Sequence, residues 1–208
     1  MHCRNILAAM VIVLFLCSHC FALFGDKRIG QAKRMWKEGR YREAAILLRK
    51  VCAESEEKAC NTLFELMKKL PDGVRAELEA ECNRGSADAC ADLGWHHWAK
   101  ADFSIGCQYY HRACEYGDAL SCWCIGLAYS GGKMLRMNCT KAEMFLLRAC
   151  DRNIGLACLA LGSMYRNGCG SVSKNKKLAR KYLKKACSLH VKEACKELRP
   201  LWRKILGF

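Results

Sequence analysis

The chain has 208 residues, of which 17 are cysteine, 35 are lysine or arginine and 20 are aspartate or glutamate. This length is enough to bury a hydrophobic core, and a hydrophobic fraction of 52% excludes a largely disordered protein. The cysteine content indicates an oxidising compartment, because cytosolic proteins rarely keep so many thiols without metals. The net charge of +15 predicts attraction to anionic partners.

The first 22 residues have the pattern of a cleaved secretory signal peptide. Arg4 precedes the apolar run 6–17, and Cys20-Phe21-Ala22 supplies the small residues that a signal peptidase needs. The mature chain would keep 14 cysteines. Extended to Phe24, the stretch is almost long enough to span a bilayer, so an uncleaved anchor is the alternative. We expect an exported protein, either secreted or periplasmic.

Ten cysteines form five pairs with one spacing, and this spacing reveals an internal repeat. Seven residues separate the two cysteines of each pair, and successive pairs start 30, 32, 36 and 37 residues apart. The pairs are Cys52 with Cys60, Cys82 with Cys90, Cys114 with Cys122, Cys150 with Cys158, and Cys187 with Cys195. We expect each pair to be a disulfide that joins the end of one helix to the start of the next.

Apolar residues keep the same positions around each pair and predict two helices per repeat. Offsets of three, four and seven residues after the second cysteine mark one face of a first helix, helix A. Glycine stands at offset four in three repeats, at Gly94, Gly126 and Gly162. Because glycine inside a helix costs about 1 kcal/mol, it predicts that another helix approaches closely there. A second amphipathic helix, helix B, ends at the first cysteine of the next pair.

The predicted fold class is all-α: an α-solenoid of about five disulfide-stapled helix A–helix B repeats in a slightly curved right-handed superhelix. It covers residues 23–199, starts with a helical hairpin turned at Glu38-Gly39-Arg40, and ends in a C-terminal capping tail over residues 200–208. The second repeat departs from the pattern. Phe64 replaces the glycine and Pro71-Asp72-Gly73 replaces the longer loop, so the packing of this repeat is the hardest to predict.

The motif Leu-Gly-x-x-Tyr-x-x-Gly from Leu161 to Gly168, with Ala-x-x-Tyr-Leu-Lys-Lys-Ala-Cys from Ala179 to Cys187, resembles the Sel1-like repeat, a relative of the tetratricopeptide repeat. With a signal peptide and cysteines seven apart, the chain more closely resembles the Helicobacter cysteine-rich protein family. That resemblance implies secreted helical repeats that bind and slowly hydrolyse β-lactams or act at the host–microbe boundary. Related cysteine-rich repeats also occur in the mitochondrial intermembrane space, but the Arg-poor apolar leader favours secretion.

The residues themselves present no catalytic constellation. The Ser-x-x-Lys from Ser171 to Lys174 lies in a basic loop, and the Ser-Asp-Asn and Lys-Thr-Gly motifs of serine β-lactamases are missing. His97 occupies a packing position, whereas His96 is expected at the surface. We therefore predict no catalytic residue, no metal and no cofactor. If the protein is an enzyme, the family resemblance alone implies a β-lactamase.

Four cysteines of the mature chain lie outside the five pairs. Cys139 begins a helix B and Cys169 lies in the next loop between helices A and B. Such loops line one edge of a solenoid, so a bridge between these two is one arrangement. Cys107 and Cys124 could pair, stay free or bond another chain, and the sequence does not settle their connectivity.

Helix A positions that vary between repeats predict the binding surface. These positions carry Trp95, Trp98, Trp123 and Arg166, which lie one, five or eight residues after a second cysteine. Solenoids bind through such extended faces, and aromatic residues anchor binding sites. The alternative is that the tryptophans pack between neighbouring repeats. The main hypothesis is a binding scaffold for a peptide, a protein or a cell-wall-related ligand.

A second candidate surface is basic. Residues 171–208 hold twelve Lys or Arg and two Asp or Glu. Seven of the cations lie on or just before one helix, at Lys174, Lys176, Lys177, Arg180, Lys181, Lys184 and Lys185. They form either a solvated helix face or a surface that binds an anionic envelope polymer, a lipid or an acidic partner. Nucleic acid is not an expected partner of an exported protein.

Overall fold

The computed structural model describes residues 27–54, 57–131 and 135–198, and these are helical apart from turns, loops and one isolated bridge between Cys169 and Val172. A first helix covers residues 27–37, and the others are α2 (Tyr41–Ala53), α3 (Glu57–Met67), α4 (Asp72–Asn83), α5 (Ala87–Ala99), α6 (Phe103–Glu115), α7 (Ala119–Gly131), α8 (Cys139–Asp151), α9 (Gly155–Asn167), α10 (Lys176–Ser188) and α11 (Lys192–Leu198). The predicted signal peptide and the tail 200–208 lie outside the described residues.

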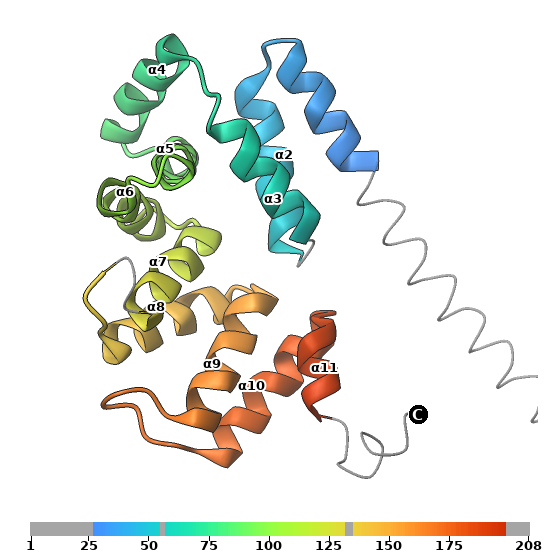
Figure 1. The fold of residues 1–208 in the computed structure, drawn as a ribbon, viewed down its shortest axis with the longest axis vertical. Coiled ribbons are helices and arrows are strands. Elements are labelled where there is room, and N and C mark those ends of the chain that lie inside the picture. The colour runs from blue at the N-terminus through green and yellow to red at the C-terminus, as the bar shows by residue number, and fades with distance from the viewer. Residues whose placement is uncertain (1–26, 55–56, 132–134, 199–208) are drawn as a thin grey trace, which may run out of the picture.

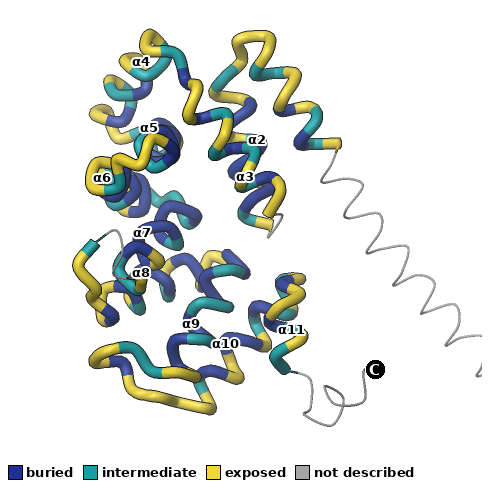
Figure 2. Tube along the Cα trace, viewed as in Figure 1, coloured by how far each residue is buried: buried dark blue, intermediate teal, exposed yellow. Residues whose placement is uncertain are grey.

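The helices pack in pairs that follow an open, curved path (Figure 1). Helices α5 and α6, α7 and α8, and α9 and α10 form the predicted A–B pairs. Figure 2 shows that buried residues lie where the helices meet, whereas the loop between α9 and α10 is largely exposed. None of the helices in the described segments is long and apolar enough to span a membrane.

Glycine lets helix B lie directly on helix A, as the sequence predicts. A Cβ atom on Gly162 of α9 would lie 2.7 Å from Cγ of Leu183 on α10. On Gly126 of α7 it would lie 2.8 Å from Cγ of Leu146 on α8. Because protein interiors are close-packed, contacts this short leave no room for a methyl group.

Replacing Gly162 with alanine should destabilise the protein by about 1–3 kcal/mol, because the added methyl group pushes Leu183 out of its place. Gly131, the last residue of α7, has no heavy atom within 4 Å of an added Cβ. Its replacement with alanine should stabilise the protein by up to about 1 kcal/mol, since alanine is the better helix former. Chemical denaturation of both variants measures the two effects. A Gly162→Ala variant as stable as the parent would contradict the close contact of α9 and α10.

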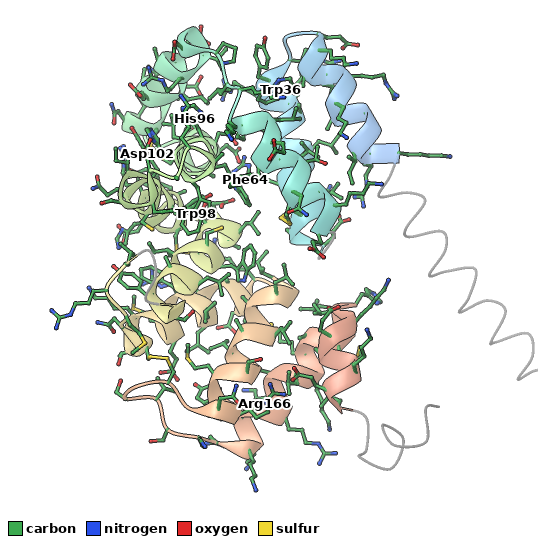
Figure 3. All side chains as sticks on the ribbon, viewed as in Figure 1. Trp36, Phe64, His96, Trp98, Asp102 and Arg166 are labelled. Carbon is green, nitrogen blue, oxygen red and sulfur yellow. A yellow bond between two sulfur atoms is a disulfide. The ribbon has the colours of Figure 1, made fainter. Side chains whose placement is uncertain are left out.

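The second repeat departs from this arrangement, because α3 and α4 make little or no contact with each other. Half-buried Phe64 stands at the glycine position of α3, and Figure 3 shows it between the ribbons of α3 and α5. A side chain of this size blocks the close approach that glycine allows in the other repeats. Both α3 and α4 pack against α5 instead.

Six disulfides staple the described residues. Five join the predicted cysteine pairs, with Cα–Cα distances between 4.7 and 4.9 Å. The sixth joins Cys139, at the start of α8, to Cys169 in the loop between α9 and α10. Cys107 and Cys124 are free and buried. Burial raises the pKa of the Cys107 thiol to about 11 and raises the pKa of Cys124 as well, so both stay protonated at neutral pH.

Candidate functional site

Two of the three predicted tryptophans pack within a repeat. The rings of Trp95 and Trp98 on α5 lie 6.1 and 5.4 Å from the ring of Tyr110 on α6. Trp98, labelled in Figure 3, also meets Phe103 edge-on. Trp95 is only 7% exposed. The structure therefore corrects the expectation that Trp95 lies on an open face. Helix α3 covers α5 here, an arrangement that follows from the altered second repeat.

The same packing corrects the expectation for His96. This residue is 1% exposed, and its Nδ1 lies 2.8 Å from the backbone oxygen of Met67 at the end of α3. Burial lowers the pKa of His96, which favours the neutral ring. His97 stacks on Tyr109 at a centroid distance of 5.4 Å, in agreement with its predicted packing role.

The helix A surface remains open on α7 and α9, which contact each other. Leu127 is 37% exposed, and Trp123 and Leu159 are half-buried. Trp123 and Leu159 both directly follow the second cysteine of their repeats, so they occupy equivalent positions on neighbouring helices. We call Trp123, Leu127 and Leu159 the α7–α9 face. It is an apolar surface on two helices that disulfides join to their neighbours.

Arg166 is exposed at the end of α9 (Figure 3). Its Nη1 lies 2.6 Å from Oε2 of Glu197 on α11. This ion pair links the last two A helices. The guanidinium is therefore engaged on one side by α11.

A buried ion-pair network ties α2 and α5 to the start of α7. Arg49 of α2 is 5% exposed, and its guanidinium lies 2.5 Å from Asp88, 3.2 Å from Asp92 and 3.6 Å from Asp118. Asp118 also accepts the backbone N–H of Ser121 at 2.7 Å and so caps α7. One cation thus holds the start of the helix that carries Trp123 and Leu127.

Burial and pairing oppose each other in this network. Burial raises the pKa of Asp92 to about 6, against the attraction of Arg49. Burial also lowers the pKa of Arg49, but Asp92, Asp118 and Asp88 outweigh it and raise that pKa overall. At neutral pH Arg49 is charged and Asp92 is mostly charged, so each depends on the other for compensation.

Two pockets of about 410 Å³ occupy equivalent places in successive repeats. Each lies between the first turns of a helix B, the tyrosine seven residues after a second cysteine, and the loop that follows. The first pocket is lined by Cys107 and His111 of α6 and by Tyr129 of α7. The second is lined by Glu143 of α8 and Tyr165 of α9.

Ser171 and Lys174 line the second pocket, but the serine is not activated there. Its Oγ lies 2.9 Å from the hydroxyl oxygen of Thr140, and the nearby carboxylate of Glu143 accepts a hydrogen bond from Tyr165. Within the described ranges, Ser171 has no hydrogen bond to a group that could take its proton, which a nucleophilic serine needs. The geometry therefore does not favour a hydrolytic role for this loop. The described part of the chain also contains no group of three His, Cys, Asp or Glu side chains arranged so that they could hold a metal ion.

Most of the predicted basic residues are exposed. Lys185 is the half-buried exception, with its Nζ 3.9 Å from Oδ1 of Asp151 on α8. The exposed ones are Lys174, Lys176, Lys177, Arg180, Lys181 and Lys184. The basic residues therefore lie on and just before α10, which is a helix B. The α7–α9 face, in contrast, belongs to two A helices.

Known proteins share this repeat. The model of the Sel1 repeat family matches residues 87–118, 120–154 and 155–191, which together are half of the chain. Cytochrome c oxidase assembly factor 7 of Xenopus tropicalis is 23% identical over 150 residues, and the match covers 65% of this chain and 65% of that protein's length.

Solved structures resemble the chain as well. A Sel1 repeat protein from Oxalobacter formigenes is 21% identical, with a TM-score of 0.52 over 59% of this chain and 95% of that one. Cysteine-rich protein B of Helicobacter pylori is 30% identical, with a TM-score of 0.45 over 60% of this chain and 97% of that one. With the family model matching three consecutive repeats of paired helices, the chain belongs to the Sel1 repeat family.

Proposed function

We propose that the protein is a binding scaffold for a peptide or protein segment, and that the α7–α9 face holds the ligand. The exposed side chain of Leu127 is the observation that carries this proposal. It lies on a helix A, at a position that differs from repeat to repeat, whereas the packing positions beside it keep their character. Solenoids bind through faces of this kind.

The chemistry of the α7–α9 face favours a peptide or protein segment over a cell-wall sugar as the ligand. Trp123, Leu127 and Leu159 offer apolar contact area, which suits an apolar side chain of a peptide or protein. A cell-wall sugar would instead need several hydrogen-bonding groups, whereas these three side chains offer a single donor, the indole N–H of Trp123. A peptide or protein segment is therefore the ligand that we propose.

The disulfides support a site of action outside a reducing cytosol. Six of them lie in the described residues, and such bonds persist in oxidising compartments. Export through the predicted signal peptide would deliver the chain to an oxidising compartment. Preorganised helices also reduce the entropy lost on binding, which favours a stapled scaffold over a flexible one. The name of the Xenopus relative, an assembly factor, agrees with a role that brings other proteins together.

Replacing Leu127 with glutamate should weaken peptide binding by about 30-fold, because removal of an anchor residue costs about 2 kcal/mol. The probe is a peptide selected from a random display library on the oxidised parent protein, with affinity measured by fluorescence anisotropy. The matched control is Ile105→Glu on α6, which adds the same charge at a side chain that is 44% exposed. Equal loss in both variants, or no loss in Leu127→Glu, would remove the α7–α9 face as the site.

A further inference from the structure

The two halves of the chain differ sharply in charge. Residues 41–120 hold ten Lys or Arg and 14 Asp or Glu, whereas residues 121–208 hold 18 Lys or Arg and four Asp or Glu. The overall positive charge is therefore not spread over the molecule. It is concentrated in the last repeats and is densest on α10, whose 13 residues include six cations and no carboxylate.

Eight of the 14 carboxylates in residues 41–120 pair with an arginine in the described structure. The ion pairs there are Arg28 with Glu54, Arg40 with Glu43, Arg42 with Glu81, Arg75 with Asp72 and Glu79, and Arg49 with Asp88, Asp92 and Asp118. These pairs within the chain reduce the attraction that the carboxylates would have for the basic helix of a second copy.

Five of the six cations of α10 lack such compensation, and only Lys185 pairs with a carboxylate in the described residues, that of Asp151. Of the other carboxylates in the second half, Glu143 accepts a hydrogen bond from Tyr165 and Glu197 pairs with Arg166. Within the described segments, Lys176, Lys177, Arg180, Lys181 and Lys184 are exposed and have no carboxylate within ion-pair distance. Lys181 lies over the aromatic ring of Tyr182, with its Nζ 5.3 Å from the ring centroid.

This arrangement is unfavourable for the helix itself. Lys177 and Lys181, and Arg180 and Lys184, are four residues apart, so their like charges lie side by side on one face and repel. The buried side of α10, formed by Ala179, Tyr182, Leu183 and Ala186, holds the helix in place despite this repulsion. Cations that weaken their own helix and find no internal partner point to an external anion.

We propose that the exposed basic face of α10 binds the surface of an anionic phospholipid bilayer. Clusters of four to eight Lys or Arg on one helix are typical of proteins that bind anionic lipid, and lysine suits diffuse attraction because it acts as a point charge. The apolar residues of α10 point inward, so this face adheres without inserting into the bilayer. A peripheral mode of binding leaves the α7–α9 face free for its ligand.

The test is co-sedimentation of the oxidised protein with phosphatidylcholine vesicles that contain or lack phosphatidylglycerol. The variant Lys177→Gln/Lys181→Gln/Lys184→Gln should bind the anionic vesicles at least about 50-fold more weakly, because each lysine near such a surface adds about fivefold in affinity. The matched control is Lys50→Gln/Lys68→Gln/Lys100→Gln, which changes net charge equally at exposed positions of the first half. It should stay within about threefold of the parent, since charges far from the contact are screened.

Three outcomes would overturn the proposal. The first is equal binding of the parent to vesicles with and without phosphatidylglycerol. The second is equal loss in the two triple variants, which would show an effect of net charge alone. The third is retained binding in the α10 variant combined with lost binding after deletion of residues 199–208, which would assign the contact to the tail. Circular dichroism melting confirms that each variant is folded, and the α10 variant should melt no lower than the parent because it removes repulsion.

Discussion

Replacing Arg49 with methionine is expected to destabilise the protein by about 3–5 kcal/mol, the largest effect of any single substitution that the structure suggests. Methionine fills a similar space, but it leaves Asp92 buried without its cation. Removing one partner of a buried pair is costly because the remaining charge stays out of water. It also releases Asp118, which caps α7. Urea denaturation of the oxidised protein measures the loss.

The double variant Arg49→Met/Asp92→Asn separates charge from shape. Because asparagine carries no charge, this variant should recover a substantial part of the stability that the single variant loses. A double variant as unstable as Arg49→Met would show that the loss comes from packing, and would contradict the account of the network.

The pH dependence of stability gives a further check on the same network. The pKa of Asp92 rises from an ordinary value of 3.8 in the unfolded chain to about 6 in the folded protein. An acid whose pKa is raised by folding contributes most stability below the lower value and loses it as the pH rises through the higher one. In Arg49→Met the carboxyl has lost its cation, so the variant should regain stability relative to the parent as the pH falls from 7 to 4.

Removal of the Cys139–Cys169 disulfide by two alanine substitutions is expected to cost about 4 kcal/mol, the second largest effect. This bond closes a loop between residues 30 apart, and in the chain-entropy model longer loops give larger stabilisation. It also ties the loop that carries Ser171 to the first turn of α8, where Thr140 contacts that serine. Thermal and chemical denaturation of the double variant measure the loss.

The matched control is the removal of Cys187–Cys195, whose cysteines are only eight apart. The same model gives about 2.5 kcal/mol for this shorter loop. A loss for Cys139–Cys169 that is no larger than the loss for Cys187–Cys195 would contradict the role of the long connection in holding the second pocket together.

Repeated spacing explains why the helix pairs and five disulfides could be predicted. A cysteine spacing that recurs five times in one chain is not a chance match, so the repeat can be recognised from the sequence alone. The glycine positions follow from the close contact of the paired helices. Gly126 and Gly162 indeed face Leu146 and Leu183 where an added Cβ would collide with them. Local periodicity was sufficient for these features because each depends on neighbours in the sequence.

The burial of Trp95 and His96 could not be predicted in the same way, because it depends on which helix of another repeat packs over α5. The departure at Phe64 is visible in the sequence, but its consequence is not: α3 packs on α5 and buries Trp95 and His96. The sequence pattern counted Trp95 with the open positions because its equivalents on the neighbouring helices, Leu127 and Ser163, differ from it in character. In the structure those two equivalents are not buried. Burial there is decided by a partner from another repeat.

The charged network around Arg49 left no local signal at all. Its carboxylates lie 39 to 69 residues further along the chain, and each on its own reads as an ordinary surface residue. Only the folded structure brings them around one guanidinium. The second pocket is similar, since Ser171 and Thr140 are 31 residues apart in sequence but in hydrogen-bond contact.

The most direct test of the binding-scaffold account is amide hydrogen exchange of the oxidised protein, measured with and without the display-selected peptide. We expect added protection in α7 and α9, around Trp123, Leu127 and Leu159, with little change in α10. Protection confined to the start of α8 and the loop with Ser171 would instead place the ligand in the second pocket, and would contradict the α7–α9 face as the binding site.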